Sequence, residues 1–390
     1  MNYILFDGEY RDNLLPLTFT KPVADLRIGI LTIREKWEKH LGFTTTTVTE
    51  EYLSDKFPMV EMEENIMINA SFLPTLSLVE MVSKLKASEA IYKSGELIAF
   101  FAKEQEEIDF ETFHKYEYAE DLIQIKHSWD LFSNNGVALE ADFDLITEGR
   151  ESAPIPETIH CMNKERIFLE PDVDIEIAVL NANKGAIYIG KNAEVQEGSM
   201  IRGPFAMGAY SVVKMGTKVY GPTTLGPKCK IGGEVNNAIL SGYCSKGHDG
   251  YLGNAVIGEW CNIGADSNNS NLKNNYANVK VWGYAEERFV DTGLQFCGLI
   301  MADHSKCGIN TMFNTGTVVG VSSNIYGSNF PRNFIPSFSW GGAAGLKTYS
   351  LVKAFETMDL VMRRKNEEFT AEDQKIMEHI FEVSSKYRSK

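Results

Sequence analysis

A six-residue period of apolar residues dominates the middle of this 390-residue chain. Six is neither the period of a helix nor the alternation of a simple strand, so it indicates repeated units of one short strand and one turn. Stacked units of this kind bury a continuous apolar core and form a solenoid. The period runs without a gap through Ile189, Val195, Ile201, Met207, Val213, Val219, Leu225 and Ile231.

The period then slips twice along the chain. It resumes in one short run from Tyr251 to Ile263 and in another from Met301 to Ile325. The slips predict loops that leave the solenoid at roughly 232–250 and 265–298. Loops that interrupt a regular scaffold often carry function, because the scaffold itself only needs to stack.

Residues 1–150 have a different pattern, in which short apolar runs alternate with helical spacing. Residues 3–6 and 65–68 have the composition of buried strands, and apolar spacing within 24–42 predicts a helix that ends at Gly42. Such alternation favours an α/β layer with a largely parallel sheet.

Two prolines within residues 151–160 mark the boundary between these patterns. The expected domains are therefore 1–150, the solenoid at 151–348 and a helical tail at 349–390. A capping-box pattern at 370–373 predicts the start of a helix in the tail, which we expect to cover the apolar end of the solenoid.

Composition restricts the partners of the chain. It carries 38 Lys and Arg against 53 Asp and Glu, a formal charge of −15, and no basic run interleaved with aromatic residues. Nucleic acid and membrane are therefore poor partner predictions. The N-terminus has no signal-peptide pattern, and the six cysteines form no C-x-x-C motif. We expect a cytoplasmic protein whose cysteines are reduced packing residues.

The stretch from 245 to 271, SKGHDGYLGNAVIGEWCNIGADSNNSN, begins at the first slip of the period. Its hexapeptides resemble those of the hexapeptide acyltransferases, which form left-handed parallel β-helices. Lys246, His248, Tyr251 and the following Leu-Gly resemble the acetyltransferase domain of GlmU-type bifunctional enzymes, which make UDP-N-acetylglucosamine for the cell envelope. Over its whole length the chain looks closest to a divergent, GlmU-related branch from Bacteroidetes.

The resemblance implies roles for several residues. His248 corresponds to the base that deprotonates the amine, and Glu234 to the carboxylate that orients this histidine. Tyr251 and Asn271 would bind the sugar or the thioester, Asn262 would be on the substrate side, and the backbone N–H of Ala265 would meet the oxyanion. The co-substrate would be acetyl-CoA, and the resemblance implies a homotrimer with sites between neighbouring coils.

The chain also departs from this family pattern. Asn236 stands where the family has a lysine that binds the sugar phosphate, and Lys218 aligns near the family's arginine. Lys273 and Lys280 are nearby candidates for a rearranged phosphate site. His304 is a second histidine that could take the role of base instead of His248.

The N-terminal domain resembles Rossmann-like nucleotidyltransferases in a degenerate form. Arg11 and Lys21 match positions of the family's nucleotide-binding loop, but Gly8 is the only glycine there. Asn69 and Ser71 occupy the segment where a metal-binding aspartate is expected. Mg²⁺ would be needed only if this domain is active.

Three functions remain open. The first is acetyl-CoA-dependent N-acetylation of glucosamine 1-phosphate or a related amino sugar phosphate. The second is transfer of a uridylyl or thymidylyl group to a sugar 1-phosphate by the N-terminal domain. The third is a non-catalytic scaffold that binds sugar nucleotides.

Overall fold

The computed structural model describes residues 1–105 and 107–388, and these divide into two compact units. The first unit comprises Met1–Leu14, Thr20–Leu26 and Leu31–His127. The second comprises Leu15–Phe19, Arg27–Ile30 and Ser128–Lys390, of which 389–390 lie outside the described residues.

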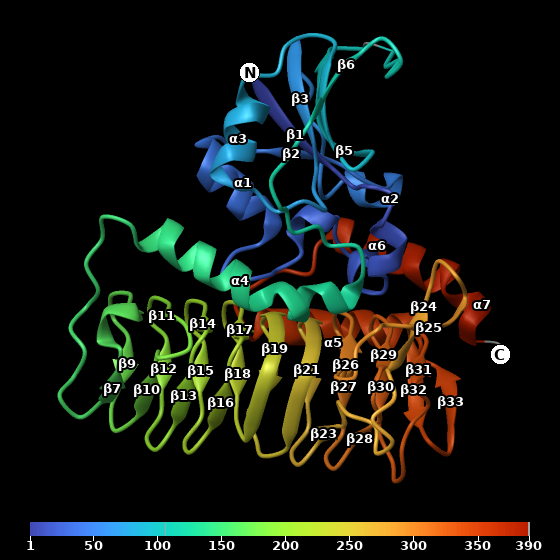
Figure 1. Cartoon of the computed structure of the whole chain (residues 1–390). Helices are drawn as coiled ribbons and strands as arrows, with labels where there is room; N and C mark the ends of the chain where they lie inside the picture. The colour runs from blue at the N-terminus through green and yellow to red at the C-terminus, as the bar shows by residue number, and fades with distance from the viewer. Residues whose placement is uncertain (106, 389–390) are drawn as a thin grey trace. The chain divides into compact units, whose positions relative to one another are not determined.

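The first unit is built on a mixed sheet (Figure 1). Within the described residues this sheet has six strands in the order β2-β1-β3-β5-β4-β6. β1 runs parallel to β2 and β3, whereas β5 is antiparallel to β3 and β4. The strands are β1 (Asn2–Phe6), β2 (Thr46–Val48), β3 (Glu64–Asn69), β4 (Glu89–Lys93), β5 (Glu96–Lys103) and β6 (His114–Glu117).

The helices of the first unit are α1 (Ile33–Leu41), α2 (Glu51–Ser54) and α3 (Leu76–Ser83). The helix predicted within 24–42 ends at Gly42 as expected, with φ of 74° at that glycine. It begins only at Ile33, because the Thr32 side chain forms a capping box with Glu35 and fixes the first turn there.

The solenoid of the second unit is a parallel β-helix, which confirms the fold inferred from the six-residue period (Figure 1). Its handedness stays a prediction. We call the stacks of short strands face 1, face 2 and face 3. Face 1 contains β7 (His160–Met162), β10 (Val179–Asn181), β13 (Met200–Arg202), β16 (Lys218–Tyr220) and the first halves of β19 (Glu234–Gly242) and β21 (Tyr251–Glu259).

The remaining strands complete the coils. Face 2 contains the second halves of β19 and β21 with β8 (Ile167–Leu169), β11 (Ile187–Ile189), β14 (Phe205–Met207), β17 (Thr223–Leu225), β26 (Leu299–Met301), β29 (Thr317–Val319) and β31 (Phe334–Ile335). Face 3 contains β9 (Asp174–Ile175), β12 (Glu194–Val195), β15 (Val212–Val213), β18 (Lys230–Ile231), β20 (Ser245–Lys246), β22 (Asn262–Ile263), β27 (Lys306–Cys307), β30 (Asn324–Ile325) and β32 (Ser339–Gly342).

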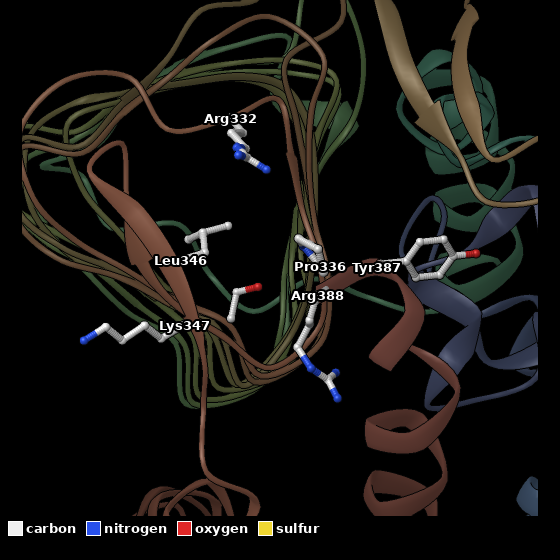
Figure 2. A pocket seen from close by; sticks show the side chains of 7 residues that line it. Arg332, Pro336, Leu346, Lys347, Tyr387 and Arg388 are labelled. Carbon is white, nitrogen blue, oxygen red and sulfur yellow. The ribbon is translucent and has the colours of Figure 1, made fainter. Parts of the chain in front are cut away.

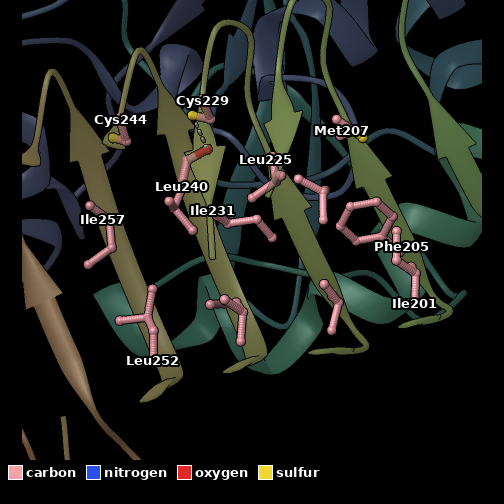
Figure 3. Packing of buried hydrophobic residues seen from close by; sticks show 14 of the residues in the cluster. Ile201, Phe205, Met207, Leu225, Cys229, Ile231, Leu240, Cys244, Leu252 and Ile257 are labelled. Atoms are coloured by element: carbon pink, nitrogen blue, oxygen red, sulfur yellow. Dashed lines mark hydrogen bonds between the residues drawn. The ribbon is translucent and has the colours of Figure 1, made fainter. Parts of the chain in front are cut away.

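The apolar ladder predicted from the sequence is the core of the β-helix. All eight positions of the uninterrupted run are between 0% and 2% exposed. Ile189 pairs with Met207 and Val195 with Val213, so each coil takes three hexapeptides. Figure 3 shows four of these side chains packed inside successive coils, namely Ile201, Met207, Leu225 and Ile231.

The first predicted loop, at 232–250, is wrong. β19 and β20 continue the coil there, and Ile231 pairs with Lys246, three residues sooner than the preceding Val213–Ile231 pair predicts. The period slips because the coil is shortened, not because a loop leaves it. The second slip is an insertion, which follows β23 (Asn268–Asn269) and carries the hairpin of β24 (Lys280–Gly283) and β25 (Arg288–Asp291).

The boundary between the units differs from the predicted one at residue 150. Helix α4 (Ser128–Thr147) belongs to the second unit and packs against β17, β19 and β21. Its Asn135 side chain accepts from the N–H of Gly29 at 2.7 Å and donates to Oγ1 of Thr224 at 3.1 Å. The helix is therefore held to the coil by buried polar contacts that no local pattern reveals.

The tail contains α5 (Leu351–Arg363), α6 (Ala371–Val383) and α7 (Ser385–Arg388), and α6 starts at the predicted capping box. It lies along the side of the coil, where Glu367 pairs with Nζ of Lys228 at 2.7 Å. The coil end is covered instead by β33 (Gly345–Thr348), whose Leu346 packs on the core. Figure 2 shows Leu346 within the outline of the stacked coils and Tyr387 outside it, around a small cavity of about 80 Å³.

Candidate functional site

His248 lies in a turn between face 3 and face 1. The turn follows β20, and His248 is exposed within it. Ser245 pairs with Asn262, so this turn stacks beside the turn of the next coil, where Asp266 donates its N–H to the carbonyl of Asp249 at 3.0 Å. Ala265 belongs to that neighbouring turn, and its role toward the oxyanion stays a prediction.

Lys246 supports the His248 turn from inside the coil. It occupies a ladder position paired with Ile231 and is only 1% exposed. Its Nζ donates to the carbonyl oxygens of Gly232 at 2.8 Å and His248 at 2.9 Å. Burial lowers the pKa of Lys246 to about 8, while Asp249 and Asp266 oppose this shift. A lysine in an otherwise aliphatic ladder was the sequence signal for this role.

A group of polar side chains lies on the outside of face 1, next to the His248 turn. Nδ2 of Asn271 donates to the Tyr251 hydroxyl at 2.9 Å and to Oδ1 of Asn254 at 2.8 Å. Burial raises the pKa of Tyr251, whereas hydrogen bonds from Asn236 and Asn271 lower it. We call Asn236, Tyr251, Asn254 and Asn271 the face 1 cluster.

Glu234 does not orient His248 within one chain. Its strand position pairs with Tyr251, and its carboxylate lies 3.6 Å from Nζ of Lys218 on the preceding coil. Among residues 1–105 and 107–388, no ion pair joins Glu234 to His248. The side chain projects from a strand of face 1, whereas the histidine lies in the corner turn.

Asn262 and His304 lie apart from the face 1 cluster. Asn262 is exposed on face 3, paired with Ser245 and Lys306. His304 is 6% exposed at the corner between face 2 and face 3, where its ring stacks on Trp260 at 6.1 Å. His304 is therefore packed at the opposite end of face 3 from the exposed His248 turn.

Lys273 and Lys280 meet in a cavity of their own. This cavity of about 700 Å³ is also lined by Arg332, Asn333, Thr315 and two phenylalanines, Phe289 and Phe334. Its lining contains no member of the face 1 cluster. The two lysines therefore come together as cations, but not around Tyr251 as the sequence suggested.

In the first unit, polar residues gather where β1 and β2 end. Asp7, which sequence reasoning missed, follows β1 and is bonded by the Val23 N–H at 2.7 Å and the Thr49 hydroxyl at 2.6 Å. Nε of Arg11 lies 3.3 Å from its carboxylate. Burial raises the pKa of Asp7 despite these contacts. Lys21 is buried in the same unit, at 7% exposure.

The neighbouring strand β3 ends in neutral groups. Oδ1 of Asn69 accepts from the backbone and hydroxyl of Ser71 at 3.0 and 2.8 Å. The described residues contain no group of three His, Cys, Asp or Glu side chains that could hold a metal. Asp7 alone, with both oxygens already bonded, does not fit the carboxylate set expected for Mg²⁺.

The fold and these sites define a chain with a mixed α/β unit followed by a parallel β-helix. Residues 3–151 match a protein family described as sugar nucleotidyl transferase. On this match the protein is an enzyme of the transferase class. No curated protein matches the chain.

Solved structures similar to this chain include several acyl-group transferases. An Arabidopsis UDP-N-acetylglucosamine acyltransferase is 14% identical, with 55% of this chain and 80% of that chain covered and a TM-score of 0.24. A polysialic acid-specific acetyltransferase, NeuO, is 12% identical over 49% and 81%, with a TM-score of 0.23. A hexapeptide transferase family protein from Anaplasma phagocytophilum is 15% identical over 60% and 90%, with a TM-score of 0.13.

All six cysteines are free thiols, and only Cys161 is not fully buried. In the part of the chain that the structure describes, no helix has the length and apolar content to cross a membrane.

Proposed function

We propose that the β-helix is an acyltransferase that moves an acetyl group from acetyl-CoA to an amino sugar phosphate, of which glucosamine 1-phosphate is the first candidate. The observation that carries this proposal is the juxtaposition of an exposed histidine, a buried lysine bonded to its carbonyl, and the face 1 cluster. Together they offer a proton acceptor beside hydrogen-bonding groups for a sugar.

In this proposal, the amine attacks the thioester carbonyl and His248 takes the proton that the nitrogen loses. The tetrahedral oxyanion accepts a hydrogen bond from the backbone N–H of Ala265. When the carbon–sulfur bond breaks, the imidazolium returns the proton to the coenzyme A thiolate. Tyr251 and Asn271 hold the sugar, because their mutual hydrogen bond fixes both side chains beforehand.

We further propose that the site is completed by a second copy in a homotrimer. Face 1 and its turns carry exposed apolar side chains, which a subunit contact would cover. On face 1 and its turns these are Met200 (50% exposed), Met215 (70%) and Tyr220 (41%), and beyond face 1 they are continued by Ile309 (68%) and Met312 (37%) at β28 (Met312–Phe313). A neighbouring chain would also explain why no carboxylate among residues 1–105 and 107–388 bonds His248. A monomeric mass in light scattering would contradict the shared site.

The test is release of free coenzyme A thiol from acetyl-CoA in the presence of glucosamine 1-phosphate. His248→Asn is expected to lower kcat about 100- to 10,000-fold, the range typical of losing a general base. His160→Asn is the matched control, because His160 is an exposed histidine on β7 of the same β-helix. Equal rates in wild type and His248→Asn would remove the assigned base, and failure to bind acetyl-CoA would favour the scaffold function.

A second candidate, nucleotidyl transfer by the first unit, is favoured by the family match over residues 3–151. Arg11 and Lys21 would bind the nucleotide phosphates there. Pyrophosphate release from UTP or dTTP with sugar 1-phosphates and Mg²⁺ would test it, with Lys21→Gln as the inactivating variant. Absence of release with every pair would reject this activity.

A further inference from the structure

The cavity around Lys273 and Lys280 lies between the insertion and the last coils of the β-helix. The insertion contributes the two lysines and Phe289, and the coils contribute Thr315, Asn333 and the pair Arg332 and Phe334. Its volume of about 700 Å³ is within the range of small-molecule sites.

The walls of this cavity are fixed by packing. The Trp282 ring stacks on Phe334 at 4.3 Å and meets Phe289 edge-on at 5.5 Å, so one indole supports both aromatic walls. Nδ2 of Asn333 donates to the carbonyl of Thr315 at 2.8 Å. Nζ of Lys273 donates to the carbonyl of Asn278 at 2.7 Å. The site is therefore largely formed before any ligand arrives.

The charge of the cavity is unusual for this chain. Lys273, Lys280 and Arg332 line it, and within the described residues none of them forms an ion pair. Asp291 is the cross-strand neighbour of Lys280, but its Oδ1 accepts from the N–H of Gly293 at 2.9 Å. Three cations without a carboxylate, in a protein of net charge −15, make a local anion-attracting field.

We propose that this cavity binds a nucleoside phosphate, with the phosphates among the three cations and the base against Phe289 and Phe334. Cations suit phosphate oxygens, and aromatic faces suit a planar base. The ligand could be a free nucleotide or the nucleotide end of a larger cofactor such as coenzyme A. This inference does not rest on acetyl transfer at His248.

Calorimetric titration of the full chain with ADP tests the proposal. Lys280→Gln and Arg332→Gln are each expected to weaken ADP binding about tenfold or more, because each removes a charged phosphate contact. Arg288→Gln is the matched control, since Arg288 is on β25 of the same hairpin but does not line the cavity. Phe289→Leu should weaken ADP binding but not pyrophosphate binding.

Coenzyme A in competition with ADP identifies the source of the nucleotide. If ADP and coenzyme A compete for the wild-type protein but not for Lys280→Gln, the site binds the nucleotide end of the cofactor. If ADP binds and coenzyme A does not, the site binds a free nucleotide. The proposal is overturned if ADP does not bind, if binding is unchanged in Lys280→Gln and Arg332→Gln, or if Arg288→Gln weakens it equally.

Discussion

The inside of the β-helix and the sheet edge of the first unit use polar residues in opposite ways. In the coil, Lys246 takes the place of an inward-facing apolar residue, and it donates hydrogen bonds to the main-chain carbonyls of Gly232 and His248. Where the strands of the first unit end, Asp7 accepts hydrogen bonds from the Val23 N–H and the Thr49 hydroxyl. Asn69 accepts a hydrogen bond from the Ser71 hydroxyl. The comparison shows that the lysine that interrupts the apolar pattern of the coil lies under an exposed histidine. In the first unit, by contrast, the polar side chains at the ends of the strands mainly form hydrogen bonds with groups of the same unit.

The largest expected effect tests how strongly the ladder defines the β-helix. Leu225→Ala removes a side chain that is 1% exposed and leaves a cavity between coils. It is expected to lower the free energy of unfolding by about 2 to 5 kcal/mol in urea titrations. Val352→Ala, at a position on α5 that is 67% exposed, should change it by less than about 1 kcal/mol. Similar losses in both variants would contradict the ladder as the core.

Lys246→Met tests whether the lysine in the ladder serves function at the expense of stability. Methionine keeps the apolar stem but removes the buried charge, so acetyl transfer should fall about tenfold or more while the protein unfolds at the same or a higher urea concentration. Circular dichroism would check that the coil is intact. A stable variant with full activity would show that Lys246 does not position His248 for catalysis.

The same lysine predicts a dependence of stability on pH. Because burial lowers its pKa from 10.5 to about 8, the unfolded chain binds more protons between these values, and the folded state gains stability as pH rises through this window. The gain is about 3 kcal/mol at most. Urea titrations at pH 8 and pH 10 should show the wild type gaining stability relative to Lys246→Met. A constant difference would contradict the shift.

The smallest expected effect tests whether the face 1 cluster binds the substrate. Tyr251→Phe removes the hydroxyl that accepts from Asn271 and should raise KM for the amino sugar phosphate about three- to tenfold. Stability should change by about 1 kcal/mol or less. Tyr210→Phe is the control, because Tyr210 is 57% exposed in a turn of the same β-helix. Equal KM values in both variants would remove Tyr251 from substrate binding.

Local patterns were sufficient for the parts of the fold that depend on neighbours in sequence. The capping box at Thr370 and the glycine that ends α1 were predictable, because each needs only residues within one turn. The predicted loop at 232–250 failed for the opposite reason. A shortened coil and an excursion give the same slip in the apolar period, and only the strand pairing of Ile231 with Lys246 tells them apart.

The roles of the candidate site residues stay predictions, but the structure shows which of them lie near one another. His248, Tyr251 and Asn271 lie in one region, whereas Glu234 pairs with Lys218, and Lys273 and Lys280 line another cavity with Arg332. Arg332 could not be predicted as a partner, because the insertion brings residues from distant coils together.

The sequence by itself determined that this chain forms a parallel solenoid, because each inward position requires only an apolar side chain at a fixed interval. The tertiary structure decided which polar groups meet on its surface. Contacts between coils depend on the number of residues in each coil, because a shift of one residue turns a strand side chain to the opposite side of the sheet. For this reason the buried ammonium under His248 and the three cations around one cavity appear only when the coils are stacked.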